Sequence, residues 1–293
     1  MRLNDRDIAL AAVRNDGCAL KYASEALQND QEVALAAVTQ YGMALGYASE
    51  TLQNDRKVVH AAVVQHGFAL EYASDTLKND RYIVLVSVAQ FGSTLMYASN
   101  RLQNDREIVL AAVSQYGFAL SYASEALQND HEIVLAAVTQ DAWSLKYACP
   151  MLRNDRDIVL AAVAQYGSTL KYASMTRQND REIVFAAVAQ YGFALRFASK
   201  TCQSDCDIVL AAVAQDGFAL QFALETLQTD AYFISAAVHE NRKAVVIVPY
   251  ERRAEFQRAG PAQTRLLFKY MPIQFTLPEE VVVMHILPKC HRR

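Results

Sequence analysis

The stretch "LQNDREIVLAAVSQYGFALSYASEALQND" (residues 102–130) begins and ends on the same four letters, and this recurrence decides the fold. Recurrence at a fixed period is typical of repeat architectures, in which each unit packs on its neighbours. The sequence therefore predicts a tandem repeat array over residues 1–239. An Asp returns every 25 residues without an insertion, at positions 5, 30, 55, 80, 105, 130, 155, 180, 205 and 230.

Each unit contains two helical patterns. The first begins at an Asn-Asp pair, where Asn104 or Asp105 can accept a hydrogen bond from an unpaired N–H of the first helical turn. Its apolar residues cover most of the circumference, which indicates a helix buried between neighbours. Gly117 follows at a place where a left-handed residue would end the helix. A second helix is expected from about Phe118 to about Gln128.

Stacking has to supply the hydrophobic core of these units. Helices of about ten residues are marginal in isolation, and one hairpin cannot bury its own apolar faces. We therefore expect an all-α protein, an α-solenoid of about nine helix-turn-helix repeats. Residues 240–293 leave the period, and two apolar runs in them (243–250 and 278–287) read as strands. We expect a small mixed α/β or irregular C-terminal cap or tail there.

The repeat pattern "LxxDREIVLAAVxQxGxALxYASxxL" resembles the repeat of the DUF4116 family, a domain of unknown function. The resemblance covers about residues 3–239 and implies a short helical repeat in tandem arrays. It implies no activity, so no functional residue is carried over from it. The chain departs from the pattern at "QDAWSLKYACPMLRND" (140–155), and at Arg177 and Cys202, which replace a recurrent Leu.

Composition and charge limit the class of protein. The chain has a net charge of −3 and is 53% hydrophobic, but residues 1–239 carry 18 Lys and Arg against 26 Asp and Glu, while residues 240–293 carry 10 against 5. The five cysteines are irregularly placed, which fits a reducing compartment. No secretory signal is recognisable, and no apolar run approaches the roughly 20 residues of a membrane span. We predict a soluble, intracellular and cytoplasmic protein.

The recurrent polar residues allow a structural and a functional interpretation. The aspartates could form a ladder of carboxylates for cations, but consecutive units should lie roughly 10 Å apart, too far to share one metal ion. We interpret them as helix caps, and the recurrent glutamines as an amide ladder between repeats rather than a recognition stripe. Recurrent tyrosines such as Tyr122 could stack on bases, but their helical spacing favours the core. The predicted caps are Asp30, Asp55, Asp80, Asp105, Asp130, Asp155 and Asp180.

No motif in the chain carries recognisable enzyme chemistry. The histidines lack metal-ligand spacing, and Cys202 and Cys206 read as inert thiols rather than half of a zinc site. Walker A, Rossmann, nucleophile-elbow and HExxH patterns are missing from the sequence. We predict a protein that is not an enzyme and that binds no cofactor and no metal, with residues 240–293 left open as a small catalytic module.

The residues that vary between units carry the functional hypothesis. Two positions that should be exposed vary between units, and they form a stripe that is mainly acidic in the early units and basic at four residues of the later ones. One interpretation is a solvated face without a partner, and the other is a surface for an acidic peptide or a phosphate-bearing ligand. The proposed surface residues are Lys146, Lys171, Arg196 and Lys200.

We therefore predict a non-enzymatic scaffold that binds a protein or peptide along one extended face. The alternative is a helical-repeat protein that binds nucleic acid through the basic positions and the basic tail, which the acidic array disfavours. A third possibility is an array that targets a C-terminal catalytic module. The first helix would leave one apolar side uncovered, which allows end-to-end self-association.

Overall fold

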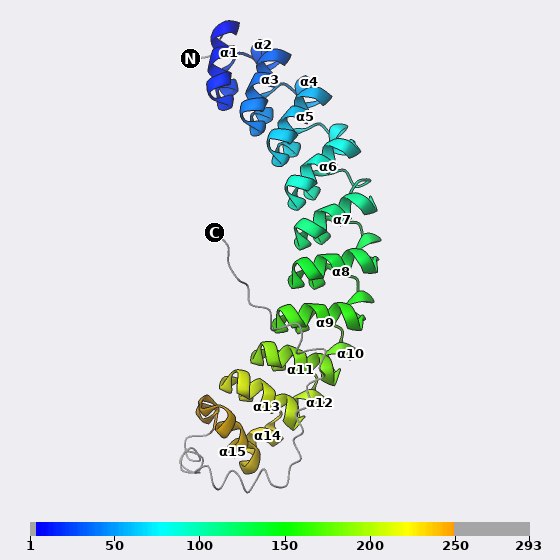
Figure 1. Ribbon diagram of the computed structural model, residues 1–293, viewed down its shortest axis with the longest axis vertical. Coiled ribbons are helices and arrows are strands. Elements are labelled where there is room, and N and C mark those ends of the chain that lie inside the picture. Colours follow the sequence, from blue (N-terminus) through cyan, green and yellow to red (C-terminus); the bar gives the residue numbers. More distant parts are fainter. Residues whose placement is uncertain (1–3, 249–293) are drawn as a thin grey trace, which may run out of the picture.

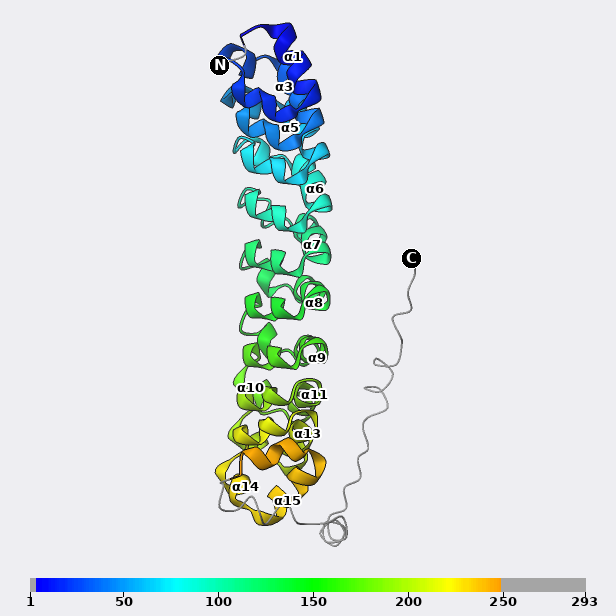
Figure 2. The same ribbon diagram turned by 90° about the vertical axis from the view of Figure 1, so that its left-hand side faces the viewer.

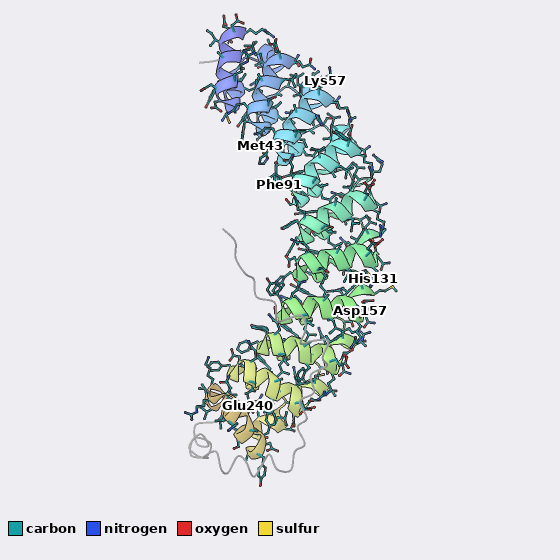
Figure 3. All side chains as sticks on the ribbon, in the orientation of Figure 1. Met43, Lys57, Phe91, His131, Asp157 and Glu240 are labelled. Carbon is teal, nitrogen blue, oxygen red and sulfur yellow. The ribbon has the colours of Figure 1, made fainter. Side chains whose placement is uncertain are left out.

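The structure is a computed structural model that describes residues 4–248. These residues form an arc of stacked helices (Figure 1). Lys57, His131 and Asp157, near the starts of their helices, lie on the convex side, whereas Met43 and Phe91 lie on the concave side (Figure 3). Each long helix therefore runs from the convex side to the concave side, and the chain returns through the segments that follow it. The predicted α-solenoid is confirmed.

Ten long α-helices, each of ten residues, recur within the described residues. They are α1 (Arg6–Asn15), α3 (Gln31–Gln40), α5 (Arg56–Gln65), α6 (Arg81–Gln90), α7 (Arg106–Gln115), α8 (His131–Gln140), α9 (Arg156–Gln165), α11 (Arg181–Gln190), α13 (Cys206–Gln215) and α15 (Ala231–Glu240).

Each long helix is followed by a short 3-10 helix. These are η1 (Gly17–Tyr22), η2 (Gly42–Tyr47), η3 (Gly67–Tyr72), η5 (Gly92–Tyr97), η6 (Gly117–Tyr122), η8 (Ala142–Tyr147), η10 (Gly167–Tyr172), η11 (Gly192–Phe197), η12 (Gly217–Phe222) and η13 (Arg242–Val246).

A short segment then leads to the next long helix. In most repeats it contains one helical turn, and where it is labelled in Figure 1 it lies towards the convex side. These turns are α2 (Glu25–Gln28), α4 (Glu50–Gln53), η4 (Leu77–Asn79), η7 (Leu127–Asn129), η9 (Leu152–Asn154), α10 (Met175–Gln178), α12 (Lys200–Gln203) and α14 (Glu225–Thr229).

The recurrent aspartates cap the long helices. Asp105 Oδ1 accepts from the backbone N–H of Glu107 (3.1 Å) and of Ile108 (3.2 Å), which satisfies two donors of the first turn of α7. The residue before it is not the cap, because Asn104 Oδ1 accepts from the Ser124 hydroxyl of the next repeat at 2.5 Å. The same capping is seen at all seven predicted positions: Asp30, Asp55, Asp80, Asp105, Asp130, Asp155 and Asp180.

The predicted second helix is wrong as a single helix. The 3-10 helix η6 ends at Tyr122, and Ala123 has an extended backbone (φ −70°, ψ 154°). This break lets the Ser124 N–H donate to the Gln103 carbonyl of the preceding repeat at 2.9 Å. Gln128 Nε2 donates to the Leu120 carbonyl (3.1 Å), which also accepts from the backbone N–H of Ala123. Contacts between repeats therefore outweigh the local helical pattern.

The predicted left-handed role of the recurrent glycine is also wrong. Gly117 begins η6, and the preceding Tyr116 has an extended backbone (φ −143°, ψ 98°). A Cβ at Gly117 would lie 2.5 Å from the Ala137 carbonyl oxygen of α8. Glycine is needed because the next repeat approaches the backbone closely, a use of glycine that requires no positive φ.

The hydrophobic core lies between the long helices and the 3-10 helices, which form neighbouring columns in Figure 2. Val113 of α7 and Leu120 of η6 are fully buried, and small residues such as Ala112 and Ala119 let the columns approach. The equivalent residues of successive repeats form one continuous core. Ile8 of α1 is 58% exposed, whereas Val33, its equivalent in the next repeat, is fully buried.

The helical pattern continues past the boundary expected at residue 239. Asn241 accepts from the Lys243 N–H at 3.1 Å and starts η13, and Ala244 is fully buried at the position of Ala219 in the preceding repeat. The strand predicted over residues 243–250 is therefore wrong where the chain is described, because packing on η12 outweighs the β-propensity of the valines. The predicted strand at 278–287 and the rest of the C-terminal cap, tail or catalytic module lie outside the described residues.

Candidate partner-binding surface

The recurrent aspartates also join neighbouring repeats along the convex edge. Asp130 uses Oδ1 to cap α8, and its Oδ2 accepts from Arg106 Nε of the preceding repeat at 3.2 Å. Arg106 also pairs with Glu132. Partial burial opposes ionisation of Asp130, but the hydrogen bonds from the Ile133 amide and from Arg106 outweigh it and hold the pKa of Asp130 below its ordinary value. This ladder of arginines and carboxylates is structural.

The recurrent glutamines form a second ladder, as predicted. Gln140 Oε1 accepts from the Gly117 N–H of the preceding repeat at 2.6 Å, and its Nε2 donates to the Gln115 carbonyl at 3.1 Å. The amide thus satisfies backbone groups that the end of one helix and the start of the next would otherwise leave unpaired. These glutamines are therefore committed to contacts between repeats.

Acidic residues are concentrated towards the convex side. Of the 26 Asp and Glu residues in residues 1–239, all but Asp16, Glu71, Asp141 and Asp216 lie in the short segments, in the caps or in the first turns of the long helices. The 3-10 helices and short segments of three consecutive repeats contain no carboxylate, namely residues 142–153, 167–178 and 192–203. The net charge of the array therefore hides a local cationic region.

Three of the four predicted surface residues lie in this region at one position of consecutive 3-10 helices. Lys146 of η8, Lys171 of η10 and Arg196 of η11 are all exposed. These 3-10 helices contact one another in order, η8 with η10 and η10 with η11. The structure therefore brings the three cations into one row, which we name the cationic strip.

The three cations rest on aromatic rings instead of carboxylates. Lys171 Nζ lies 4.8 Å from the ring centroid of Trp143 and 4.6 Å from that of Tyr172. Arg196 Cζ lies 4.9 Å from the Phe197 ring, and Lys146 Nζ lies 5.5 Å from the ring of the adjacent tyrosine. Within residues 4–248 none of the three forms an ion pair, whereas the arginines that begin long helices, such as Arg106, do.

Lys200, the fourth predicted surface residue, lies outside the strip. It begins α12, after the extended backbone of Ala198 and Ser199, and Lys200 Nζ donates to Gln203 Oε1 at 3.1 Å. The structure therefore separates it from Arg196, although the two residues are only four apart in sequence.

Two exposed apolar side chains follow cations of the strip in sequence. Met175 occupies a position that the sequence predicts to be exposed, whereas Met151 was not identified from the sequence. Met151 is 75% exposed and Met175 is 88% exposed, each in the short segment that follows a cation of the strip. Methionine adapts its shape and is common on binding surfaces. Met151 and Trp143 belong to the unit that departs from the repeat pattern. Departure from the pattern was the signal that could have located them.

The other aromatic residues have two roles. The recurrent tyrosines from Tyr47 to Tyr172 are half-buried and packed against the core, in agreement with the sequence interpretation, whereas Tyr22 of the first repeat is 60% exposed. A second set follows the long helices, and of these Tyr116, Tyr166 and Tyr191 are 41%, 49% and 40% exposed. Phe91, at the equivalent position, lies on the concave side of the arc (Figure 3). The concave margin therefore offers aromatic rings beside the 3-10 helices.

Metal-ligating clusters, free thiols and surface depressions are the other places where a site could form. In the part of the chain that the structure describes, no three His, Cys, Asp or Glu side chains come together as a metal ion would require. Burial raises the pKa of the Cys202 thiol, which is free, as is Cys206. A shallow depression between α7 and α8, lined by residues such as Ser114 and Leu135, lies on the long-helix layer.

The helices of residues 4–248 include none with the length and apolar character needed to cross a bilayer.

Sequence comparison identifies the family of the repeat. The family described as "Domain of unknown function (DUF4116)" matches residues 5–53, 55–103, 80–128, 105–153, 130–177, 155–203 and 180–228. Each match spans about two of the 25-residue units, and together they cover most of the array. The chain therefore belongs to the DUF4116 family. Comparison with curated proteins and comparison with solved structures found no match.

Proposed function

We propose that this DUF4116 protein is a non-enzymatic scaffold that binds an extended peptide segment of a partner protein along its 3-10 layer. The observation that carries the proposal is the cationic strip, in which Lys146, Lys171 and Arg196 are exposed, in register and without a carboxylate partner among the described residues.

The shape of the surface supports recognition of an elongated partner. The strip crosses three stacked repeats instead of closing around a cavity, so a ligand would contact it from one side. Each repeat would contribute a modest contact, and the summed contacts would set the affinity. Hydrogen bonds between these repeats, which include those of Gln165 with α8 and of Gln190 with Gly167, would hold the strip in register and so lower the ordering cost on binding.

The proposal is tested by selection with the full-length protein. The immobilised chain is exposed to a displayed library of random peptides and, separately, to a pool of random single-stranded RNA. We expect enrichment of peptides that share acidic positions and no comparable enrichment of RNA. Enrichment of RNA without peptides would replace the proposal with the nucleic-acid alternative. If neither pool is enriched, the peptide-scaffold function is rejected.

A further inference from the structure

The spacing of the cationic strip carries a more specific inference about its partner. Neighbouring packed helices lie about 8–10 Å apart, so consecutive cations of the strip present positive charge at about this interval. The strip therefore presents three positive charges at a regular interval, and anionic groups that recur at the same interval would match it.

We propose that the strip recognises three acidic side chains, each three residues apart, in a peptide bound as a polyproline II helix. This inference rests on the proposed peptide-binding function. A polyproline II helix has three residues per turn and rises about 3.1 Å per residue, so side chains at i, i+3 and i+6 share one face about 9 Å apart. A β-strand instead repeats its faces every two residues, about 6.6 Å, which does not match the interval.

The way the cations are held makes them available to such a ligand. A cation over an aromatic ring at an exposed site is only weakly stabilised. A partner carboxylate can therefore approach Lys171 without breaking an ion pair, while Trp143 and Tyr172 keep the ammonium group in place. The 3-10 helices and short segments that carry the strip, residues 142–153, 167–178 and 192–203, contain no acidic side chain that would compete with such a ligand.

The residues at the equivalent position of the other 3-10 helices favour a peptide over a nucleic acid. A single-stranded nucleic acid carries a uniform charge along its backbone and would need cations throughout. The residues at this position are instead of mixed charge. Apart from Lys21 in the first repeat, only the three consecutive residues of the strip are basic. A peptide can be acidic over three repeats and different elsewhere. The residues at this position are, in chain order, Lys21, Gly46, Glu71, Met96, Ser121, Lys146, Lys171, Arg196 and Gln221.

The test uses three synthetic peptides of identical composition and the full-length protein. They carry three Glu residues at i, i+3 and i+6, at i, i+2 and i+4, or in succession, with prolines among the other positions. Binding is measured by calorimetry and by the emission of Trp143, the single Trp of the chain, which lies under Lys171. We expect the first peptide to bind about tenfold more tightly than the others and to change the emission of Trp143.

Two variants locate the binding site. Lys171→Gln removes one charge of the strip and should weaken the first peptide about tenfold, while Lys200→Gln, outside the strip, should leave its affinity unchanged. Circular dichroism checks that both variants fold. Equal affinity for the three spacings, or an unchanged affinity in Lys171→Gln, would overturn the inference.

The remaining outcomes separate the two proposals. If peptides from the random library bind but the i, i+3, i+6 peptide does not, the inference fails and the proposed function stands. If neither binds, both fail. Tighter binding of a single-stranded oligouridine with a change in Trp143 emission would assign the strip to nucleic acid and would also reject the inference.

Discussion

Gln140 Oε1 lies 2.6 Å from the backbone nitrogen of Gly117, one repeat earlier, and this hydrogen bond joins the two neighbouring repeats. The equivalent bond is found in most repeats, for example from Gly67 to Gln90 at 2.9 Å and from Gly192 to Gln215 at 2.6 Å. No such bond joins Ala142 to Gln165, which donates to the carbonyls of α8 instead. The methyl group of Ala142 stands where every other repeat from Gly17 to Gly217 has none.

Gly117→Ala should destabilise the array. The added Cβ would meet the Ala137 carbonyl oxygen at 2.5 Å and the Ser144 hydroxyl at 2.7 Å, so the next repeat must move away. We expect a loss of about 1–3 kcal/mol in the free energy of unfolding, as for other overpacked sites, measured by urea unfolding. The reciprocal Ala142→Gly should cause no loss, because relief of crowding offsets the usual penalty of glycine. Equal destabilisation by both changes would contradict this account.

Asp130→Asn should reduce stability at neutral pH and not in acid. Asn caps a helix about as well as Asp, so the change removes mainly the negative charge that Arg106 contacts. The lowered pKa of Asp130 in the folded protein means that its charge stabilises the fold above the unfolded pKa of about 3.9. This contribution is lost as the pH falls through the folded pKa.

Urea unfolding at several pH values from 7 to below 3 checks this pH dependence. The difference in the free energy of unfolding between Asp130→Asn and the parent protein should shrink as the pH falls. Asp75→Asn is the matched control, because within the described residues the Asp75 side chain has no hydrogen bond or ion pair, and it should have little effect at any pH. If Asp130→Asn still lowers the free energy of unfolding below pH 3, the charge of Asp130 is not the cause of the lost stability.

Ser124→Ala should weaken the contact between two repeats. The Ser124 hydroxyl donates to Asn104 Oδ1, and we expect its removal to cost about 1 kcal/mol. In one repeat Cys149 stands at this position, with Sγ 2.7 Å from Asn129 Oδ1. Because a thiol is a weaker donor, Cys149→Ser should raise the free energy of unfolding. Chemical unfolding of the two variants checks the direction of each change in the free energy of unfolding. An increase in stability in Ser124→Ala would contradict the assigned role of the hydroxyl.

The sequence predicted the long helices well because their period, their Asp caps and their apolar residues agree with one another. It did not predict the break after Tyr122, because Ala123 and Ser124 are compatible with a helix and the extended backbone is set by the Gln103 carbonyl of the preceding repeat. The same limit applies to η13, where burial of Ala244 outweighs a strand-like run of valines.

The candidate site was predictable only in part. Variation between units identified Lys146, Lys171 and Arg196, but sequence spacing alone also included Lys200, which the break before α12 displaces. The contact of Lys171 with Trp143 joins residues 28 positions apart in neighbouring repeats. Such a contact depends on the stacking geometry, which no pattern within one unit contains.

The most direct test of the proposed function is the affinity of one library-selected peptide for a triple charge reversal of the strip. The triple variant carries Lys146→Glu, Lys171→Glu and Arg196→Glu, and Lys200→Glu is the matched control outside the strip. Because all four side chains are exposed, both variants should keep the urea midpoint of the parent protein. The account predicts that the triple variant loses peptide binding by about tenfold or more while Lys200→Glu retains it. Unchanged binding by a folded triple variant would contradict the account.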